Sequence, residues 1–151
     1  MGAKMMVLAL AAAVAVPAMA ADLEVGERFS ARCVGVVDGA TVVVLPDGGD
    51  EVTVGLYGVD APGLDDRMGH KVRAHLRQLA KGETVEVVIT GIDASGASAR
   101  VTLAGDDLSR TLTQRGLVRP VGGDPELASL AESARELGCG LWAESAEASV
   151  S

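Results

Sequence analysis

Aromatic residues are nearly absent from this 151-residue chain, which contains only Phe29, Tyr57 and Trp142. Proteins that hold single-stranded nucleic acid usually stack its bases on aromatic side chains, and three residues supply almost no such platform. Basic residues are also scarce, because 13 Lys and Arg stand against 21 Asp and Glu, a net charge of −8. Nucleic-acid-binding surfaces are normally basic, since neutralising phosphates releases counterions. The composition therefore disfavours a nucleic-acid partner unless the few cations cluster on one face.

Long apolar runs are absent except near the start of the chain. Lys4 supplies a positive charge, residues 5–16 are apolar, and Ala18-Met19-Ala20 resembles a cleavage site with small residues on both sides. We predict that residues 1–20 are an export signal, so that the protein is periplasmic or secreted. An uncleaved membrane anchor is the less favoured alternative, because the run is short for a spanning helix. Cleavage would remove Lys4 and no acid, which makes the charge −9 instead of −8.

Cysteine is also rare, with only Cys33 and Cys139 present. In an exported chain an even number of cysteines favours a disulfide. This bond would close a loop of about a hundred residues and contribute about 4 kcal/mol in the chain-entropy model. The alternative is that both cysteines are small apolar side chains in the interior. The sequence has no Cys-x-x-Cys or Cys/His spacing that would indicate zinc or redox chemistry.

What the chain does contain is alternating apolar residues, with Val most frequent among them, and this pattern predicts strands. The five predicted strands cover residues 32–37, 41–45, 52–57, 85–90 and 99–103. Helical spacing of apolar residues predicts three helices, at 69–82, 107–116 and 124–138, the last with an Asp-Pro start and a Gly end. Strands interrupted by one helix after the third predict an α+β, mainly β fold, a five-stranded OB-fold barrel with three helices. We assign residues 21–143 to this one domain and 144–151 to a flexible tail.

Four segments of the chain resemble the staphylococcal nuclease (thermonuclease-like) domain family. They are Val-Asp-Gly-Ala-Thr at 37–41, Val-Gly-Leu-Tyr-Gly-Val-Asp-Ala-Pro-Gly at 54–63, residues 107–118, and residues 132–142, which end in Gly-Leu-Trp. Together they extend over nearly the whole chain after residue 30. The resemblance implies an OB barrel with three helices, in agreement with the order of predicted elements. It also implies the family's activity, which is calcium-dependent hydrolysis of phosphodiesters in nucleic acid.

The family's chemistry needs specific residue types. A carboxylate pair holds the hard cation, which together with two arginines stabilises charge on the phosphate, and a glutamate activates water. The resemblance places the second metal-binding aspartate at Ala40, the two arginines at Gly55 and Ala97, and the glutamate at Gly63, so that only Asp60 is retained. Losing a single such group costs about 10²–10³ in rate. We therefore expect no intact catalytic site and no cofactor.

Other residues are weaker candidates for the missing roles. Arg100 could replace the second arginine only after a three-residue slip, and its alternation with apolar neighbours indicates a solvent-facing strand position. Asp65, Asp66 and His70 lie close in sequence, but acids before a helix usually cap it or face solvent. His70 and His75 are separated by about 140° around a helix, so they do not converge on one ion.

The sequence leaves three functional hypotheses. The preferred one is a non-enzymatic binding or structural module that contacts a protein or an envelope ligand. The second is a divergent nuclease that binds calcium through Asp60, Asp65 or Asp66. The third is a binder of envelope oligosaccharides or peptides through the barrel face or a strand edge, although the scarcity of aromatics weighs against sugars.

Overall fold

The structure, a computed structural model, describes residues 23–142. The predicted export signal at 1–20 and the predicted tail at 144–151 lie outside the described residues. Among the helices of residues 23–142, none is long and apolar enough to cross a membrane.

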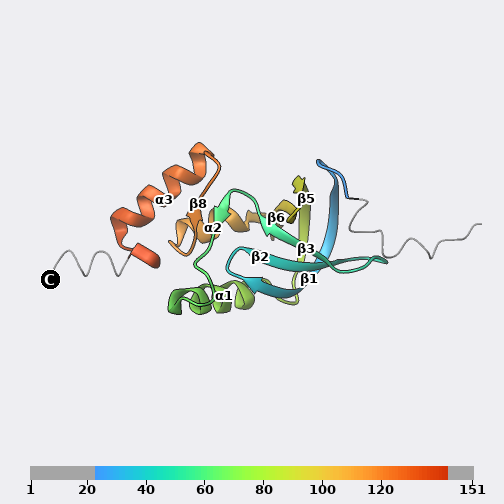
Figure 1. Ribbon diagram of the computed structural model, residues 1–151, viewed down its shortest axis with the longest axis horizontal. Helices are drawn as coiled ribbons and strands as arrows, with labels where there is room; N and C mark the ends of the chain where they lie inside the picture. Colours follow the sequence, from blue (N-terminus) through green and yellow to red (C-terminus); the bar gives the residue numbers. More distant parts are fainter. Residues whose placement is uncertain (1–22, 143–151) are drawn as a thin grey trace, which may run out of the picture.

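Five longer strands form a closed ring, and all five coincide with strands predicted from the alternating pattern. They are β1 (Arg28–Asp38), β2 (Thr41–Pro46), β3 (Val52–Leu56), β5 (Thr84–Asp93) and β6 (Gly96–Leu103). They pair antiparallel in the order β3-β2-β1-β5-β6, and a parallel pairing of β3 with β6 closes the ring (Figure 1). The first half of β1 pairs with β5 and its second half with β2. An irregular register after Cys33 lets this long strand bend between its two partners.

Three two-residue strands were not predicted, because they are too short to show any alternation of apolar residues. Strand β4 (Val59–Asp60) pairs with β8 (Arg119–Pro120), and β7 (Asp106–Asp107) forms a hairpin with β6. The β4–β8 pair ties the segment after β3 to the segment before the last helix. It therefore connects the ring to the helical end of the molecule.

The three predicted helices are confirmed as α1 (Arg67–Ala80), α2 (Leu108–Gln114) and α3 (Pro125–Leu137). Each begins after an aspartate whose carboxylate accepts a backbone N–H of the first turn; these N-caps are Asp66, Asp107 and Asp124. Helix α3 ends at Gly138, which has the left-handed φ of 67° that favours glycine.

The core fills the ring and continues beneath α1, which lies along one side of the strands (Figure 1). Helix α1 buries Val72, Leu76 and Ala80 against the ring. Gly39, in the β1–β2 turn, allows this close approach, because a Cβ there would overlap Val72 and lie 2.9 Å from the Cβ of Ala61. The close packing of α1 on the ring therefore needs a residue without a side chain at position 39.

The predicted disulfide is wrong, since Cys33 and Cys139 are both free thiols. Cys33 is buried in β1, where its N–H donates to the carbonyl of Glu83 at the start of β5. Cys139 follows α3, and its N–H donates to the carbonyl of Ala134 in that helix. Figure 1 shows α3 at the end of the molecule away from the ring. Cys33 instead matches the alternative, a small side chain in the core.

Candidate functional site

Three of the positions marked by the family resemblance lie together where β2, β3 and β6 meet. Gly55 pairs with Thr41 of β2 on one side and with Ser98 of β6 on the other. A Cβ at Gly55 would lie 3.9 Å from the carbonyl oxygen of Ala97 and 4.0 Å from that of Ala40. The structure therefore brings Ala40, Gly55 and Ala97 to one place, and each of them carries a small side chain or none.

A cavity of about 380 Å³ lies at this place. Its lining is small and hydroxyl-rich, formed by Thr41, Thr53, Gly55, Asp93, Ser95, Gly96, Ala97 and Ser98. Asp93 is the only charged residue of this lining, and no Lys, Arg or His contributes to it. A phosphate would therefore meet no positive side chain in the cavity and one negative one.

The Asp93 carboxylate shapes the turn between β5 and β6. Its Oδ1 accepts hydrogen bonds from the Ser95 hydroxyl at 2.6 Å and from the Ser95 N–H at 2.8 Å. These hydrogen bonds lower the pKa of the Asp93 carboxyl below its usual value, the hydroxyl having the larger effect. The negative charge at this rim is therefore stable, which adds to the unsuitability of the cavity for an anion.

Asp60, the carboxylate that the resemblance marks as a metal ligand, lies on the short strand β4, opposite Arg119 of β8. It is exposed, and its side chain makes no hydrogen bond or ion pair with a described residue. The neighbouring residue Ala61 lies against Gly39, so Asp60 is close to the β1–β2 turn that carries Ala40. Position 40, where the resemblance implies a second metal-binding aspartate, carries only the methyl group of an alanine.

Gly63 and the acidic residues after it form the start of α1. The Gly63 carbonyl lies directly against Gly69, and the Asp65 carboxylate is close to the place where a Gly63 side chain would begin. Asp66 uses its carboxylate to cap α1 through the Met68 N–H at 2.8 Å. Within residues 23–142 no three Asp, Glu, His or Cys side chains are grouped so that they could hold a metal ion. Asp65, Asp66 and His70 are therefore not brought together as ligands.

Arg100 belongs to a structural network that the sequence reasoning missed. Its guanidinium lies 4.2 Å from the centre of the Tyr57 ring, 3.1 Å from Asp107 and 3.8 Å from Asp124. The Tyr57 hydroxyl donates to Asp124 at 3.1 Å. Backbone N–H donation from Leu127 is the main reason that the pKa of Asp124 lies below its usual value, and Tyr57 and Arg100 add to it. Arg100 thus links two helix caps to the end of β3 and does not line the cavity.

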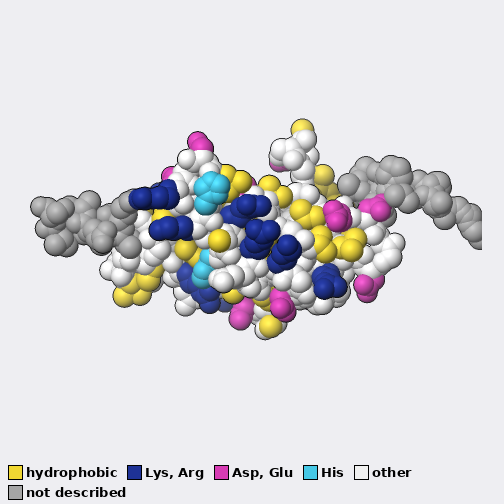
Figure 2. Space-filling view, turned by 90° about the horizontal axis from the view of Figure 1, so that it is seen from below, with side chains coloured by type: hydrophobic (Ala, Val, Ile, Leu, Met, Phe, Trp, Pro, Cys, Tyr) yellow, Lys and Arg dark blue, Asp and Glu magenta, His cyan; other side chains and the backbone are white. Residues whose placement is uncertain are grey.

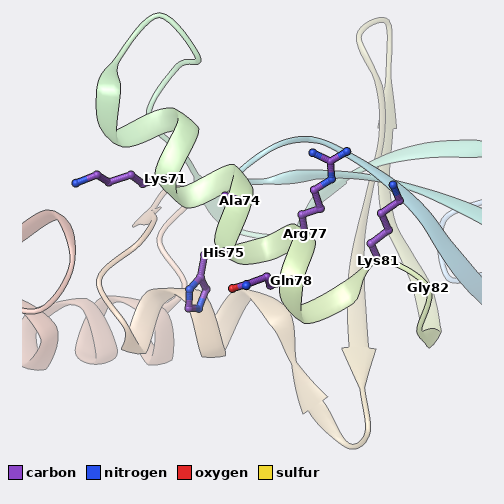
Figure 3. Close-up of a pocket in the computed structure, with 7 residues that line it drawn as sticks. All are labelled: Lys71, Ala74, His75, Arg77, Gln78, Lys81 and Gly82. Carbon is purple, nitrogen blue, oxygen red and sulfur yellow. The ribbon is translucent and has the colours of Figure 1, made fainter.

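A second and larger depression, of about 870 Å³, runs along α1 on another part of the surface. Its lining is Lys71, Ala74, His75, Arg77, Gln78, Lys81 and Gly82 (Figure 3). His75 Nε2 lies 2.8 Å from a guanidinium nitrogen of Arg115, the C-cap residue of α2. Partial burial lowers the pKa of His75, and the Arg115 charge lowers it further. The neutral His75 ring therefore accepts a hydrogen bond from Arg115.

Comparison of the chain with protein-family models and with curated proteins gives no match.

Proposed function

We propose that the chain is a staphylococcal nuclease-like OB-fold domain that has lost catalysis and acts as a non-enzymatic binding or structural module. Two observations support the fold part of this proposal. The five-membered ring of strands is closed by β3 and β6, and α1 is inserted between the third and the next long strand. A five-stranded ring agrees with an OB barrel, and the position of α1 agrees with the order of elements that the resemblance implies.

One observation carries the proposed loss of catalysis. Ala40, Gly55 and Ala97 meet beside a cavity to which no cationic side chain contributes. Phosphodiester hydrolysis needs positive charge where the phosphate oxygens become more negative in the transition state. Each missing group costs about 10²–10³ in rate, and although such losses are not additive, several together leave little catalysis.

The chain also lacks most of the oxygen ligands that a catalytic calcium ion would need. Calcium takes about 6–8 oxygen ligands, most of them from several carboxylates and carbonyls. Asp60 supplies one carboxylate, and position 40 supplies only a methyl group. A single exposed carboxylate does not hold calcium at millimolar concentrations, so no activated water or charge-neutralising cation is available.

A cleavage assay tests this proposal. The purified chain is incubated with single-stranded DNA and millimolar calcium, with Asp60→Ala as the matched variant and a chelator as the blank. We expect both proteins to cut no faster than buffer. Calcium-dependent cutting that Asp60→Ala abolishes would establish the alternative, a divergent nuclease centred on Asp60.

We also propose that residues 1–20 direct export, on the strength of the sequence pattern alone. Expression of the full chain followed by cell fractionation tests this. We expect a shortened protein outside the cytoplasm, beginning at Ala21, and a full-length cytoplasmic product would contradict the proposal. An exported, non-catalytic module would most readily act on a protein or envelope ligand.

A further inference from the structure

The cations of this acidic chain are concentrated on one helix. Five of the 13 Lys and Arg residues fall within residues 67–81, and no Asp or Glu occurs between Asp66 and Glu83. Figure 2 shows the molecule from below Figure 1, the side on which α1 lies, and Lys and Arg side chains form a band across it with acids toward its edges. We call Lys71, Arg77 and Lys81, with the depression between them, the α1 basic face.

The α1 basic face points to solvent, opposite the core. At about 100° per residue Lys81 lies opposite the buried side chain of Val72, and Lys71 and Arg77 lie on the two flanks of the exposed side, about 120° apart. Lys71, Arg77 and Lys81 are exposed and form no ion pair with a described residue. Figure 3 shows Arg77 and Lys81 extending to the side of the helix away from His75.

Stability does not explain this arrangement. Arg73, Arg77 and Lys81 follow one another at a spacing of four residues, where like charges on a helix repel and destabilise it. Arg73 relieves part of the repulsion, because its Nε–H donates to the Val36 carbonyl at 3.2 Å. Arg115 adds a further cation beside His75. Arg77 and Lys81 thus remain as neighbouring cations without an ion pair among the described residues, and an anionic ligand would offset their repulsion.

The surroundings narrow the kind of anion. No Phe, Tyr or Trp lines the depression, and its one ring, that of His75, is held by Arg115 at 2.8 Å, so the depression offers bases little to stack on. The apolar side of α1 is already buried in the core, so the helix has no apolar face to insert into lipid. Lys71 to Lys81 spans about 15 Å of helix, whereas duplex DNA is stiff over about 50 nm and would extend across the acidic remainder of the surface. A flexible polyanion without bases can follow the cations and turn away.

We propose that the α1 basic face binds inorganic polyphosphate, a flexible phosphate chain without bases. The phosphates lie along Lys71, Arg77 and Lys81, with the depression giving them room between the side chains. Binding is electrostatic, so it weakens steeply as salt is added. This site is separate from the cavity at Gly55 and goes beyond the proposed function, so it stands whether or not that cavity cleaves anything.

The test is fluorescence anisotropy of end-labelled polyphosphate titrated with the full chain at several salt concentrations. The test variant is the triple substitution Lys71→Gln, Arg77→Gln and Lys81→Gln. Its control carries the same loss of charge elsewhere, at Arg28, Arg32 and Arg110, which are exposed and lie outside α1. Gln is as good a helix former as Lys or Arg, and circular dichroism verifies that both triple variants are folded.

We expect saturable binding by the wild-type chain and the control. In the α1 variant, affinity falls, and the slope of log K against log salt becomes shallower by about 2, at about 0.7 per lost phosphate contact. Equal losses in both triple variants would overturn the proposal, as would no binding by the wild-type chain. Tighter binding to duplex DNA or to anionic vesicles, at equal phosphate concentration, would assign the face to those partners instead.

Discussion

Replacing Gly55 by alanine should stabilise the protein. A Cβ at this position would find no atom closer than 3.9 Å, which is ordinary van der Waals contact. Gly55 is not among the residues with positive φ, so alanine can adopt its backbone conformation. A compatible Gly→Ala change removes conformational freedom from the unfolded chain and adds about 0.4–1 kcal/mol to the free energy of unfolding. For a protein of this size that raises the thermal midpoint by about 1–4 °C.

Thermal unfolding followed by circular dichroism measures this shift, with Gly39→Ala as the matched control. At Gly39 the new methyl group would overlap Val72 and lie 2.9 Å from the Ala61 Cβ. Such overpacking costs about 1–3 kcal/mol, so the control should melt earlier than the wild type. A lowered midpoint for Gly55→Ala would refute the reasoning, because it would mean that the position is filled or strained. A raised midpoint supports an open position from which a side chain is simply missing.

Three further predictions concern a turn, a histidine and the thiols. Ala104 has a left-handed φ of 52° in the two-residue β6–β7 turn, where Asn-Gly is the favoured sequence. Ala104→Asn should therefore raise the midpoint of urea unfolding by the equivalent of about 1 kcal/mol, and an unchanged midpoint would argue against strain at this residue. The pKa of His75 in the folded protein lies below the ordinary value of about 6.5, so the unfolded chain binds more protons, and stability should fall as pH drops below about 6.5. The wild type should therefore lose more stability than His75→Gln between pH 7 and pH 5 in urea titrations, and parallel losses would contradict this. Ellman's reagent should modify the partly exposed Cys139 in the native protein but reach Cys33 only after unfolding, because burial shields the Cys33 thiol and raises its pKa. If the unfolded chain contained no free thiol, the prediction of a disulfide would be right after all.

Local patterns in the sequence were sufficient for the long elements. Alternating valines mark β2 and β5 because one face of each strand enters the core, and Asp124-Pro125 with Gly138 delimits α3. The strands β4, β7 and β8 have two residues each, and no periodicity exists over two residues. They form because the surrounding segments are already held in place, which only the folded structure reveals.

The site was predictable in part, for a similar reason. The resemblance selected Ala40, Gly55 and Ala97, but their meeting depends on the β3–β6 pairing, which links residues about 40 apart in sequence. The Tyr57–Asp124 hydrogen bond joins residues 67 apart in sequence, so no local pattern in the sequence predicts it. The disulfide was inferred from the even number of cysteines and the predicted export, without any measure of the distance between the two residues.

The α1 basic face, in contrast, was visible in the sequence. Residues 67–82 contain no acid, and the helical period places Lys71 and Lys81 on the side opposite Val72 and Leu76. The net charge of −8 does not reveal the cluster of cations on α1, because a sum over the whole chain does not report how the charges are distributed. Charge read along each helix face would have found it.

The proposed loss of the calcium site at Asp60 and position 40 is tested most directly by calorimetric titration of the purified chain with calcium. We predict no saturable heat up to millimolar calcium, and the same trace for Asp60→Ala, since one exposed carboxylate with a methyl group at position 40 cannot supply the ligands that calcium needs. A saturable calcium isotherm in the wild-type chain that disappears in Asp60→Ala would contradict the proposed loss of the metal site, and with it one of the two grounds for the loss of catalysis.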